Sequence, residues 1–398
     1  MAASPAATSR RPRPVTDVTA EIAIVGGGLA GLTAAVALAR TGQSIVLLAP
    51  DRPADRRTTA LLGESVAFIR SLGVFDAVAT QSQPLRGIRV IDATGRLLRA
   101  PEVLFDAAEL GLDAFGQNVP NEPLLAALEH EAARLGVVRL TATATAIEAG
   151  PDAIVIAGPE GTTVAARLCV GADGRKSSVR AAAGIGLREG RNTGQAAVVG
   201  TFEHALPHND ISTEFHTPNG PFTLVPLPGN RSALVWVTTT GEADYLRALP
   251  PAAIAEAVER QASSFLGAMT SIGPTQAFPL ATATATRLVG ERIALIGEAA
   301  HVLPPIAAQG FNLTLRDIAA LARLVSGAPD AGAPDILAAY GREREADLGV
   351  RAIAVSLLNR SLLTAFLPAH AARNLGLAVL DAVPQLRRAV MRHGLGAT

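Results

Sequence analysis

This sequence of 398 residues contains a single cysteine, has no excess of positive or negative charge, and lacks long apolar runs. Cys169 is the single cysteine, which excludes an intrachain disulfide and argues against a cysteine-based metal site. It lies in an apolar, strand-like run, where burial as a small hydrophobic residue is expected. We therefore expect no metal ion, and a reducing compartment such as the cytoplasm fits a chain with one thiol.

No excess of charge points to a polyanionic partner. Thirty-five basic residues match thirty-five acidic ones, so we expect no nucleic-acid binding, which requires a basic surface. Hydrophobic residues make up 49% of the chain, yet no apolar stretch reaches the roughly 18 residues of a membrane-spanning helix. We expect a cytoplasmic protein, and peripheral contact with a membrane stays open.

The first sixteen residues are rich in proline, alanine and serine and contain arginine but no acidic residue. A mitochondrial or chloroplast transit peptide has a similar composition. The prolines on either side of Arg13 oppose an amphipathic helix, so residues 1–16 are predicted to be a disordered tail.

A strand, a glycine turn, a helix and a second strand follow within about thirty residues. Residues 21–26 form a short apolar run that ends in glycines, residues 29–40 have helical length, and residues 45–49 are again apolar. This order predicts a βαβ unit in a parallel sheet.

The turn in this unit contains the pattern Gly-x-Gly-x-x-Gly, formed by Gly26, Gly28 and Gly31 with Leu29 and Ala30. In a dinucleotide site the first glycine permits the turn, the second lets a pyrophosphate approach, and the third lets helix and strand pack closely. The helix N-terminus adds unpaired N–H groups and partial positive charge.

The acid that usually binds the adenosine ribose is missing at the end of the second strand. Ala49 occupies its position, and Asp51 is the nearest carboxylate. Arg52 favours a rival interpretation, because an arginine here can accommodate the 2′-phosphate of NADP. The glycine motif alone therefore leaves FAD and NADP open.

Two further clusters follow predicted strands. Asp173 and Gly174 come after a strand that ends at Val170, although Asp-Gly is also common in ordinary turns. The stronger cluster runs from residue 295 to residue 317, where Glu298 can accept hydrogen bonds from a polyol. His301, within it, is predicted to be a structural, hydrogen-bonded histidine in preference to a proton carrier.

Within the third cluster, Pro304 and Pro305 stiffen the chain before Gln309 and Gly310 begin a helix. The N-terminus of that helix would stabilise negative charge on a bound ring.

Taken together, the three clusters resemble the flavoprotein aromatic hydroxylases, and most closely the branch that hydroxylates polyprenylated phenols in ubiquinone biosynthesis. The resemblance extends from about residue 21 to about residue 363. It implies an α/β fold with a Rossmann-like FAD-binding domain, a discontinuous β-sheet substrate domain of α+β type, and C-terminal helices.

The expected boundaries follow from the alternation of α/β and β-rich segments. The FAD-binding domain takes residues 17–84, 102–180 and 283–340, the substrate domain takes 85–101 and 181–282, and residues 341–398 form a C-terminal helical region. Residues 88–91 and 96–98 flank an Asp-Ala-Thr-Gly turn and predict a hairpin.

The resemblance also implies the site residues. The family usually has Asp at position 298, where this chain has the longer Glu298. Three substrate contacts are suggested weakly by position, and they are Phe222, Pro226 and Pro304. The cofactor residues are Gly26, Gly28, Leu29, Ala30, Gly31, Arg57, Gln117, Asp173, Gly297, Glu298, Pro305, Gly310, Phe311 and Asn312.

In this family, reduced FAD reacts with molecular oxygen to form a C4a-hydroperoxyflavin, which hydroxylates the aromatic ring. The cofactor performs the difficult step, so we name no catalytic side chain. Electrons would come from NAD(P)H or from a protein donor, and other quinone-biosynthesis enzymes are candidate partners. Residues 352–392 are rich in leucine and would lie on a membrane or pack on the main domain.

Three alternatives remain at this point. A flavin hydroxylase of a soluble phenol or polyketide would share every cofactor motif. A flavin reductase or dehydrogenase of prenyl lipids would turn over substrate without oxygen. A non-catalytic flavin-binding subunit of a biosynthetic complex would bind FAD without substrate-stimulated reduction.

Overall fold

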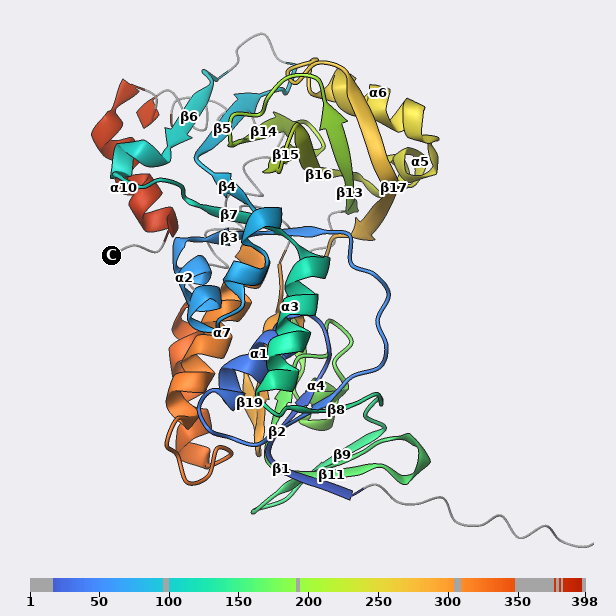
Figure 1. Ribbon diagram of the computed structural model, residues 1–398, viewed down its shortest axis with the longest axis vertical. Helices are drawn as coiled ribbons and strands as arrows, with labels where there is room; N and C mark the ends of the chain where they lie inside the picture. The colour runs from blue at the N-terminus through green and yellow to red at the C-terminus, as the bar shows by residue number, and fades with distance from the viewer. Residues whose placement is uncertain are drawn as a thin grey trace, which may run out of the picture.

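A sheet of eight strands forms the lower half of the molecule in Figure 1. The computed structural model describes residues 17–95, 100–190, 194–303, 309–347, 376, 379–380 and 382–395. The parallel strands of this sheet are β1 (Asp17–Val25), β2 (Ile45–Leu48), β8 (Val138–Leu140), β11 (Thr163–Gly171) and β20 (Ile293–Leu295). Antiparallel pairing adds β9 (Ala146–Ala149), β10 (Ile154–Ala157) and β19 (Val289–Gly290).

The central strand β1 explains why this sheet is parallel. Ile22, Ala23 and Ile24 are fully buried, and a continuous apolar run is typical of a strand that is covered on both faces. The helix that follows, α1 (Leu29–Ala39), packs against α3 (Asn121–Arg134) and α7 (Gln309–Val325). The predicted βαβ unit is therefore present as β1, α1 and β2, which confirms the expected α/β class.

A second sheet, of seven strands, lies in the upper half (Figure 1). Its strand order is β17, β13, β16, β15, β14, β5, β6. The bounds are β5 (Gly87–Asp92), β6 (Val103–Asp106), β13 (Gln195–His204), β14 (Ile211–Thr217), β15 (Gly220–Leu227), β16 (Arg231–Thr239) and β17 (Met269–Pro279).

The partner strand of residues 88–91 differs from the predicted hairpin, in which residues 96–98 were expected to pair with them. β5 pairs antiparallel with β6, which lies beyond the expected domain boundary at residue 101. Residues 96–99 lie outside the described part of the chain. Asp92 explains the wider connection, because its carboxylate accepts hydrogen bonds from the amides of Thr94 and Ala100, both at 3.0 Å.

Two small sheets and several helices complete the described structure. One sheet contains β3 (Thr58–Leu62), β4 (Gln83–Leu85) and β7 (Gly116–Pro120), and the other contains β12 (Leu187–Glu189), β18 (Ala283–Ala285) and β21 (His301–Val302). The further helices are α2 (Gly63–Ser71), α4 (Ser178–Ala182), α5 (Thr240–Ala248), α6 (Pro251–Gln261), α10 (Pro384–Leu395) and a helix that includes residues 334–347. Within the described residues, no helix is both long and apolar enough to cross a bilayer.

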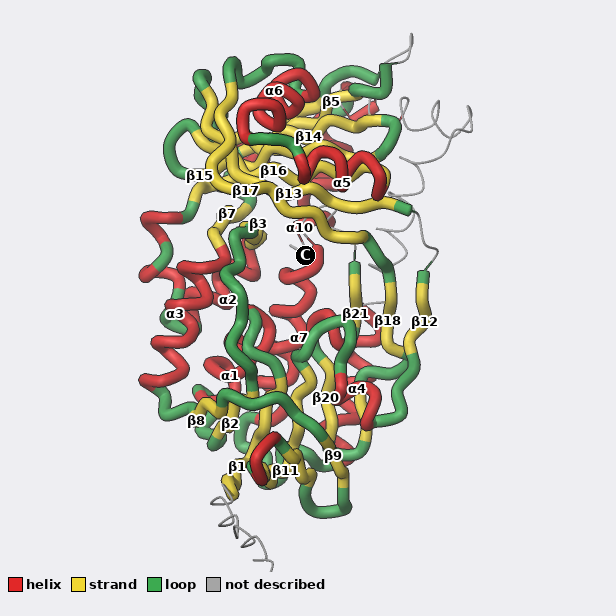
Figure 2. Tube along the Cα trace, turned by 90° about the vertical axis from the view of Figure 1, so that its right-hand side faces the viewer, coloured by secondary structure: helices red, strands yellow, loops and turns green. Residues whose placement is uncertain are grey.

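The seven-stranded sheet forms a roof with two different faces. Figure 2 shows its strands running across the upper half, with α5 and α6 on the outer side and β3 and β7 below. The outer face carries Phe222, Leu224 and Trp236 into one apolar core with Leu246 of α5 and Ile254 of α6. Because side chains alternate along a strand, the intervening residues point to the inner face, toward the first sheet.

Phe222 belongs to the outer face of the roof, not to the inner one. Its side chain is 0% exposed, and its ring meets Trp236 edge-on at 5.2 Å and Phe215 at 5.6 Å between centroids. The weak suggestion that Phe222 contacts substrate is therefore at odds with its position, because a core of two helices and a sheet surrounds it.

Phe222→Ala should lower the free energy of unfolding by about 3–5 kcal/mol, because it leaves a cavity in this core. Urea unfolding followed by circular dichroism measures the loss. Val155→Ala, on a side chain that is 40% exposed, is the control and should change stability by less than about 0.5 kcal/mol. A folded, equally stable Phe222→Ala protein with altered substrate affinity would contradict the outer-face assignment.

Candidate active site

The glycine turn after β1 is built on very close backbone approaches. Gly26 has a φ of +119°, and a Cβ added there would lie 2.3 Å from the carbonyl oxygen of Ala172. A Cβ on Gly31 would lie 1.7 Å from the carbonyl oxygen of Gly26. Both distances are far below a van der Waals contact, so only glycine allows β1, α1 and the end of β11 to meet here.

Gly28 is different, because a Cβ added there would meet no atom of the described residues within 4 Å. It is the N-cap of α1, its backbone is extended at a φ of −81°, and no side-chain hydrogen bond caps the helix. The first amides of α1, including those of Leu29 and Ala30, therefore adjoin open space. An exposed helix N-terminus without a cap fits the pyrophosphate of a dinucleotide.

The contacts of Arg52 argue against the NADP interpretation of this residue. Its guanidinium lies 2.9 Å from Glu122 and 3.8 Å from Glu129, so two carboxylates already neutralise it. Ala49 is fully buried, and a Cβ added to Gly27 would lie 2.5 Å from the Ala49 Cβ. The small residue at position 49 thus faces the glycine turn itself.

Asp173 holds the neighbouring turn in place. Its Oδ2 accepts hydrogen bonds from the amide and hydroxyl of Ser178, at 2.6 and 2.9 Å, and so caps the start of α4. Its Oδ1 is buried and has no partner among the described residues. Asp173 follows Ala172, against which Gly26 packs, so the second cluster adjoins the first.

The third cluster meets the first at Gly297. This residue has a φ of +60°, and a Cβ added there would lie 3.1 Å from the Cβ of Ala30. The next residue, Glu298, is exposed, and its carboxylate lies 3.5 Å from the Nε of Arg175. An exposed carboxylate beside the glycine turn is suited to the hydroxyl groups of a ribityl chain.

Arg57 comes to the same region from another segment. It makes a bidentate pair with Asp55, with both contacts at 2.7 Å. These hydrogen bonds, with the charges of Asp55 and Glu298, raise the pKa of Arg57 above its ordinary value, against an opposing effect of partial desolvation. Its guanidinium lies 5.5 Å from the centroid of the Phe278 ring, on the inner face of the roof, so it bridges the two halves of the molecule.

At the start of α7, the side chain of Asn312 joins the helix to β3. Its Oδ1 accepts from the amide of Leu62 at 2.9 Å and its Nδ2 donates to the carbonyl of Ala60 at 2.8 Å. Among the described residues, no atom lies within 4 Å of a Cβ added to Gly310, and Phe311 is half-buried. The start of α7 therefore lies beside β3.

The remaining predicted residues lie on β7, on β15 or outside the described part of the chain. Gln117 is on β7, paired with Leu61 of β3. Pro226 is on β15, and its carbonyl accepts a hydrogen bond from Asn118 of β7 at 2.8 Å. Pro304 and Pro305 lie outside the described residues.

A buried network of charged side chains around Asp317 makes hydrogen bonds to the third cluster. Asp317 accepts hydrogen bonds from His301 at 2.6 Å, from Arg344 at 2.8 Å and from the Gly297 amide at 3.3 Å. The hydrogen bond predicted for His301 is thus present, and its structural role stays a prediction. Asp317 was not predicted as a site residue, because its partners are 16 to 27 positions away in sequence.

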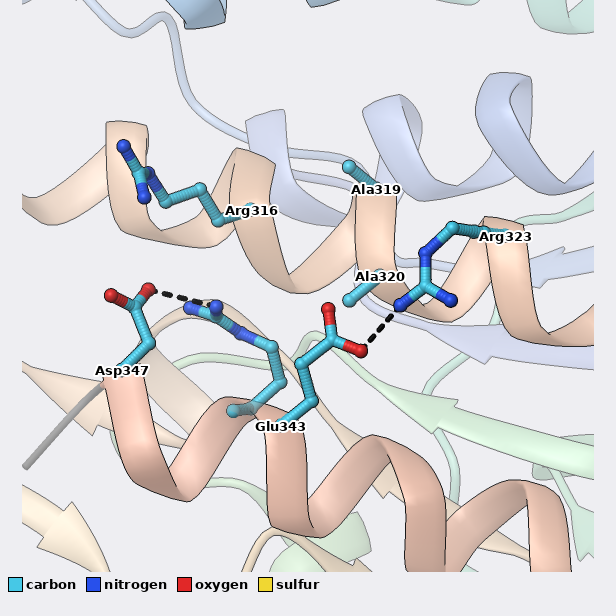
Figure 3. Close-up of a pocket in the computed structure, with 7 residues that line it drawn as sticks. Arg316, Ala319, Ala320, Arg323, Glu343 and Asp347 are labelled. Atoms are coloured by element: carbon cyan, nitrogen blue, oxygen red, sulfur yellow. Dashed lines mark hydrogen bonds and ion pairs between the residues drawn. The ribbon is translucent and has the colours of Figure 1, made fainter. Parts of the chain in front are cut away.

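A pocket of about 440 Å³ lies on the outer side of this network. Figure 3 shows it between α7 and the helix that includes residues 334–347, with Arg316, Arg323 and Glu343 at its edges. Arg323 pairs with Glu343, and Arg344 pairs with Asp347 at 2.8 Å. Most of the charged side chains that line this pocket form ion pairs with one another, and the pocket does not adjoin the glycine turn.

Comparison with known proteins covers nearly the whole chain. A family model described as "FAD binding domain" matches residues 19–350. Ubiquinone hydroxylase UbiL of Rhodospirillum rubrum is 37% identical over 399 residues, which cover 96% of this chain and 92% of the relative. The 3-demethoxyubiquinol 3-hydroxylase of Escherichia coli K12 is 30% identical over 397 residues, which cover 96% of this chain and 100% of the relative.

A solved structure shares the fold at low identity. The p-nitrophenol 4-monooxygenase PnpA from Pseudomonas putida DLL-E4 superposes with a TM-score of 0.78 and 16% identity, covering 96% of this chain and 99% of that chain. The two-sheet architecture with a roof is therefore common to both proteins.

Gly28→Val should abolish retention of FAD during purification while leaving the apoprotein as stable as the wild type. The backbone at Gly28 is extended and its surroundings are open, so the added side chain costs the fold little but occupies the space for a pyrophosphate. The bound FAD per chain and the thermal midpoint of the apoprotein are the measurements.

Gly241→Val is the matched control, because a Cβ at Gly241 on α5 also meets nothing within 4 Å. This control should keep its FAD. If the Gly28→Val protein is folded and fully yellow, the glycine turn does not hold the pyrophosphate.

Proposed function

The chain belongs to the FAD binding domain family, and we propose that it is an FAD-dependent monooxygenase that hydroxylates the ring of a polyprenylated phenol in ubiquinone biosynthesis. The two relatives described above are named as ubiquinone-pathway hydroxylases and align over almost their entire length. The observation that carries the proposal is the convergence of Gly28, Gly297 and Glu298 beside an open helix N-terminus.

The residues of this site fit FAD along its length. The amides at the start of α1 would hold the pyrophosphate beside Gly28, and Arg57 and Glu298 would bind the ribityl chain. Gly310, Phe311 and Asn312 would border the flavin ring, where the N-terminus of α7 stabilises negative charge, and Gln117 would lie near the ribityl chain or the pyrophosphate. FAD, when bound, supplies the activation of molecular oxygen that amino-acid side chains do not provide.

The roof supplies a second requirement of this chemistry, the exclusion of water. Its inner face lies over the site, and Arg57 and Asn118 join it to the lower half at two places. A covered site would keep water away from the oxygen chemistry that FAD supplies when bound. Electrons would come from NAD(P)H, bound transiently, or from a protein donor, and other quinone-biosynthesis enzymes would supply and consume the lipid substrates.

A prenylated substrate is reached most directly from a membrane surface, and α10 is suited to lie there. Val379, Val383, Leu386 and Val390 are exposed at helical spacing on and before this helix. Arg388 and Arg392 are exposed on the same helix. An apolar stripe beside arginines is the pattern of a helix that binds anionic lipid surfaces. We therefore propose peripheral contact with a membrane through α10.

Replacing two residues of the stripe together, Leu386→Asp with Val390→Asp, should lower binding to vesicles by about tenfold or more, since each residue is 44% exposed and would lose its apolar burial. Flotation with phosphatidylcholine–phosphatidylglycerol vesicles measures the bound fraction. Leu206→Asp, at a leucine that is 51% exposed on the upper half, should bind like the wild type. Equal binding by all three proteins would contradict the role of α10.

Deleting the gene in its source organism should cause a prenylated phenol that lacks one ring hydroxyl to accumulate. Mass spectrometry of lipid extracts identifies the compound. The wild-type chain and Gly241→Val should restore the quinone, and Gly28→Val should not, because it cannot hold FAD. In cells grown under ¹⁸O₂, the restored hydroxyl should carry the label.

An unchanged quinone profile in the deletion strain would overturn the assignment to ubiquinone biosynthesis and favour a soluble phenol or polyketide as substrate. Accumulation of a fully hydroxylated intermediate would instead indicate a reductase.

A further inference from the structure

The inner face of the roof is mostly aliphatic. Val199 of β13, Val235 of β16, Val225 of β15 and Val90 of β5 alternate with the outer-face residues and are half-buried. Their intermediate exposure indicates that other parts of the protein shield this face from solvent without packing closely against it. Such a surface suits the ring and hydrocarbon of an apolar substrate.

A small group of polar side chains, Glu214, His216 and Thr223, interrupts this aliphatic face. Glu214 of β14 lies opposite Thr223 of β15 and beside Val90 of β5 in the strand register. Its side chain is 21% exposed, so it reaches the space beneath the roof. Among the described residues it has no arginine or lysine partner, which is unusual for a carboxylate in an apolar setting.

Histidine and threonine side chains hold this carboxylate. The Oε1 of Glu214 is 2.8 Å from the Nε2 of His216, while its Oε2 is 3.5 Å from the hydroxyl of Thr223. The second distance is at the limit of a hydrogen bond, so Oε2 keeps the capacity to accept a stronger one. His216 is buried, and its Nδ1 has no partner within the described residues.

The position of this group in the roof is favourable for contact with a substrate. β15, which carries Thr223, also carries Pro226, whose carbonyl is bonded to Asn118 of β7. β7 pairs with β3, and β3 is joined to the start of α7 by Asn312. The carboxylate is therefore on the strand next to the one that contacts the flavin-ring side of the site.

We propose that Glu214 binds the ring hydroxyl of the substrate by accepting its hydrogen bond at Oε2, and that His216 is a positioning residue that fixes the carboxylate. The inference rests on the proposed function, because it assumes a phenol beneath the roof. It also orients that phenol, with its hydroxyl toward β14 and its apolar remainder along the valines of β13, β15 and β16. A ring without a free hydroxyl would leave the buried carboxylate unsatisfied, so Glu214 selects for phenols.

The test compares two soluble probes, 2-allylphenol and its methyl ether 2-allylanisole, by calorimetric titration of the FAD-loaded full chain. The wild type should bind the phenol about 10- to 100-fold more tightly than the ether, the range for a hydrogen bond to a charged group. Glu214→Leu should reduce this ratio to about one, mainly by weakening phenol binding. His216→Gln should lower the ratio partway, because Glu214 loses its fixed orientation.

Glu256→Leu, at an exposed carboxylate on α6 outside the roof, is the matched control and should keep the wild-type ratio. The ratio separates recognition from a structural role, because a loosened roof would weaken both probes alike. An FAD-loaded wild type that binds neither probe, or binds both equally, overturns the inference, and so does a Glu214→Leu protein with an unchanged ratio. A wild type that holds no FAD would overturn the proposed function instead, so the two failures are distinguishable.

Discussion

The structure depends on one steric constraint, the approach of four backbone segments with no room for a side chain. Gly26 packs against the carbonyl of Ala172, Gly31 packs against Gly26, and Gly297 packs against Ala30. These contacts bring the ends of β1, β11 and β20 to the start of α1. A larger residue at Gly26 or Gly31 would clash with backbone, and the φ of +60° at Gly297 strains other residues. The site therefore depends on glycine in two distant parts of the sequence, which meet at Ala172 and Ala30.

A buried charge cluster stabilises the least regular of these segments. Asp317 on α7 is almost fully buried, and an unpaired carboxylate there would be very costly. Arg344 and His301 provide partners from a second helix and from β21, and the Gly297 amide binds the same carboxylate. The network thus fixes the turn that exposes Glu298. Partners drawn from separate elements make this arrangement specific as well as stable, since each side chain has one position that satisfies it.

Local features of the site could be predicted from the sequence, and features that need strand register could not. The glycine turn was predictable because its pattern, strand and helix are contiguous. The face on which Phe222 lies could not be predicted, because Pro221, Phe222, Leu224 and Val225 give β15 apolar residues on both faces. Nothing in this run indicates which face packs against α5 and α6. The pairing of Arg52 with Glu122 joins residues 70 positions apart, so the sequence alone kept NADP open.

The two halves of the molecule divide the recognition of polar and apolar groups. Charged side chains that would face the cofactor, such as Arg57, Arg175 and Glu298, lie in the lower half, and aliphatic residues make up much of the inner face of the roof. An apolar roof lowers the local dielectric, which strengthens the few charges that remain beneath it. The same face penalises any polar group without a partner. Glu214 is tolerated there because His216 supplies one hydrogen bond, and its remaining oxygen then discriminates strongly between substrates that can donate a hydrogen bond and those that cannot.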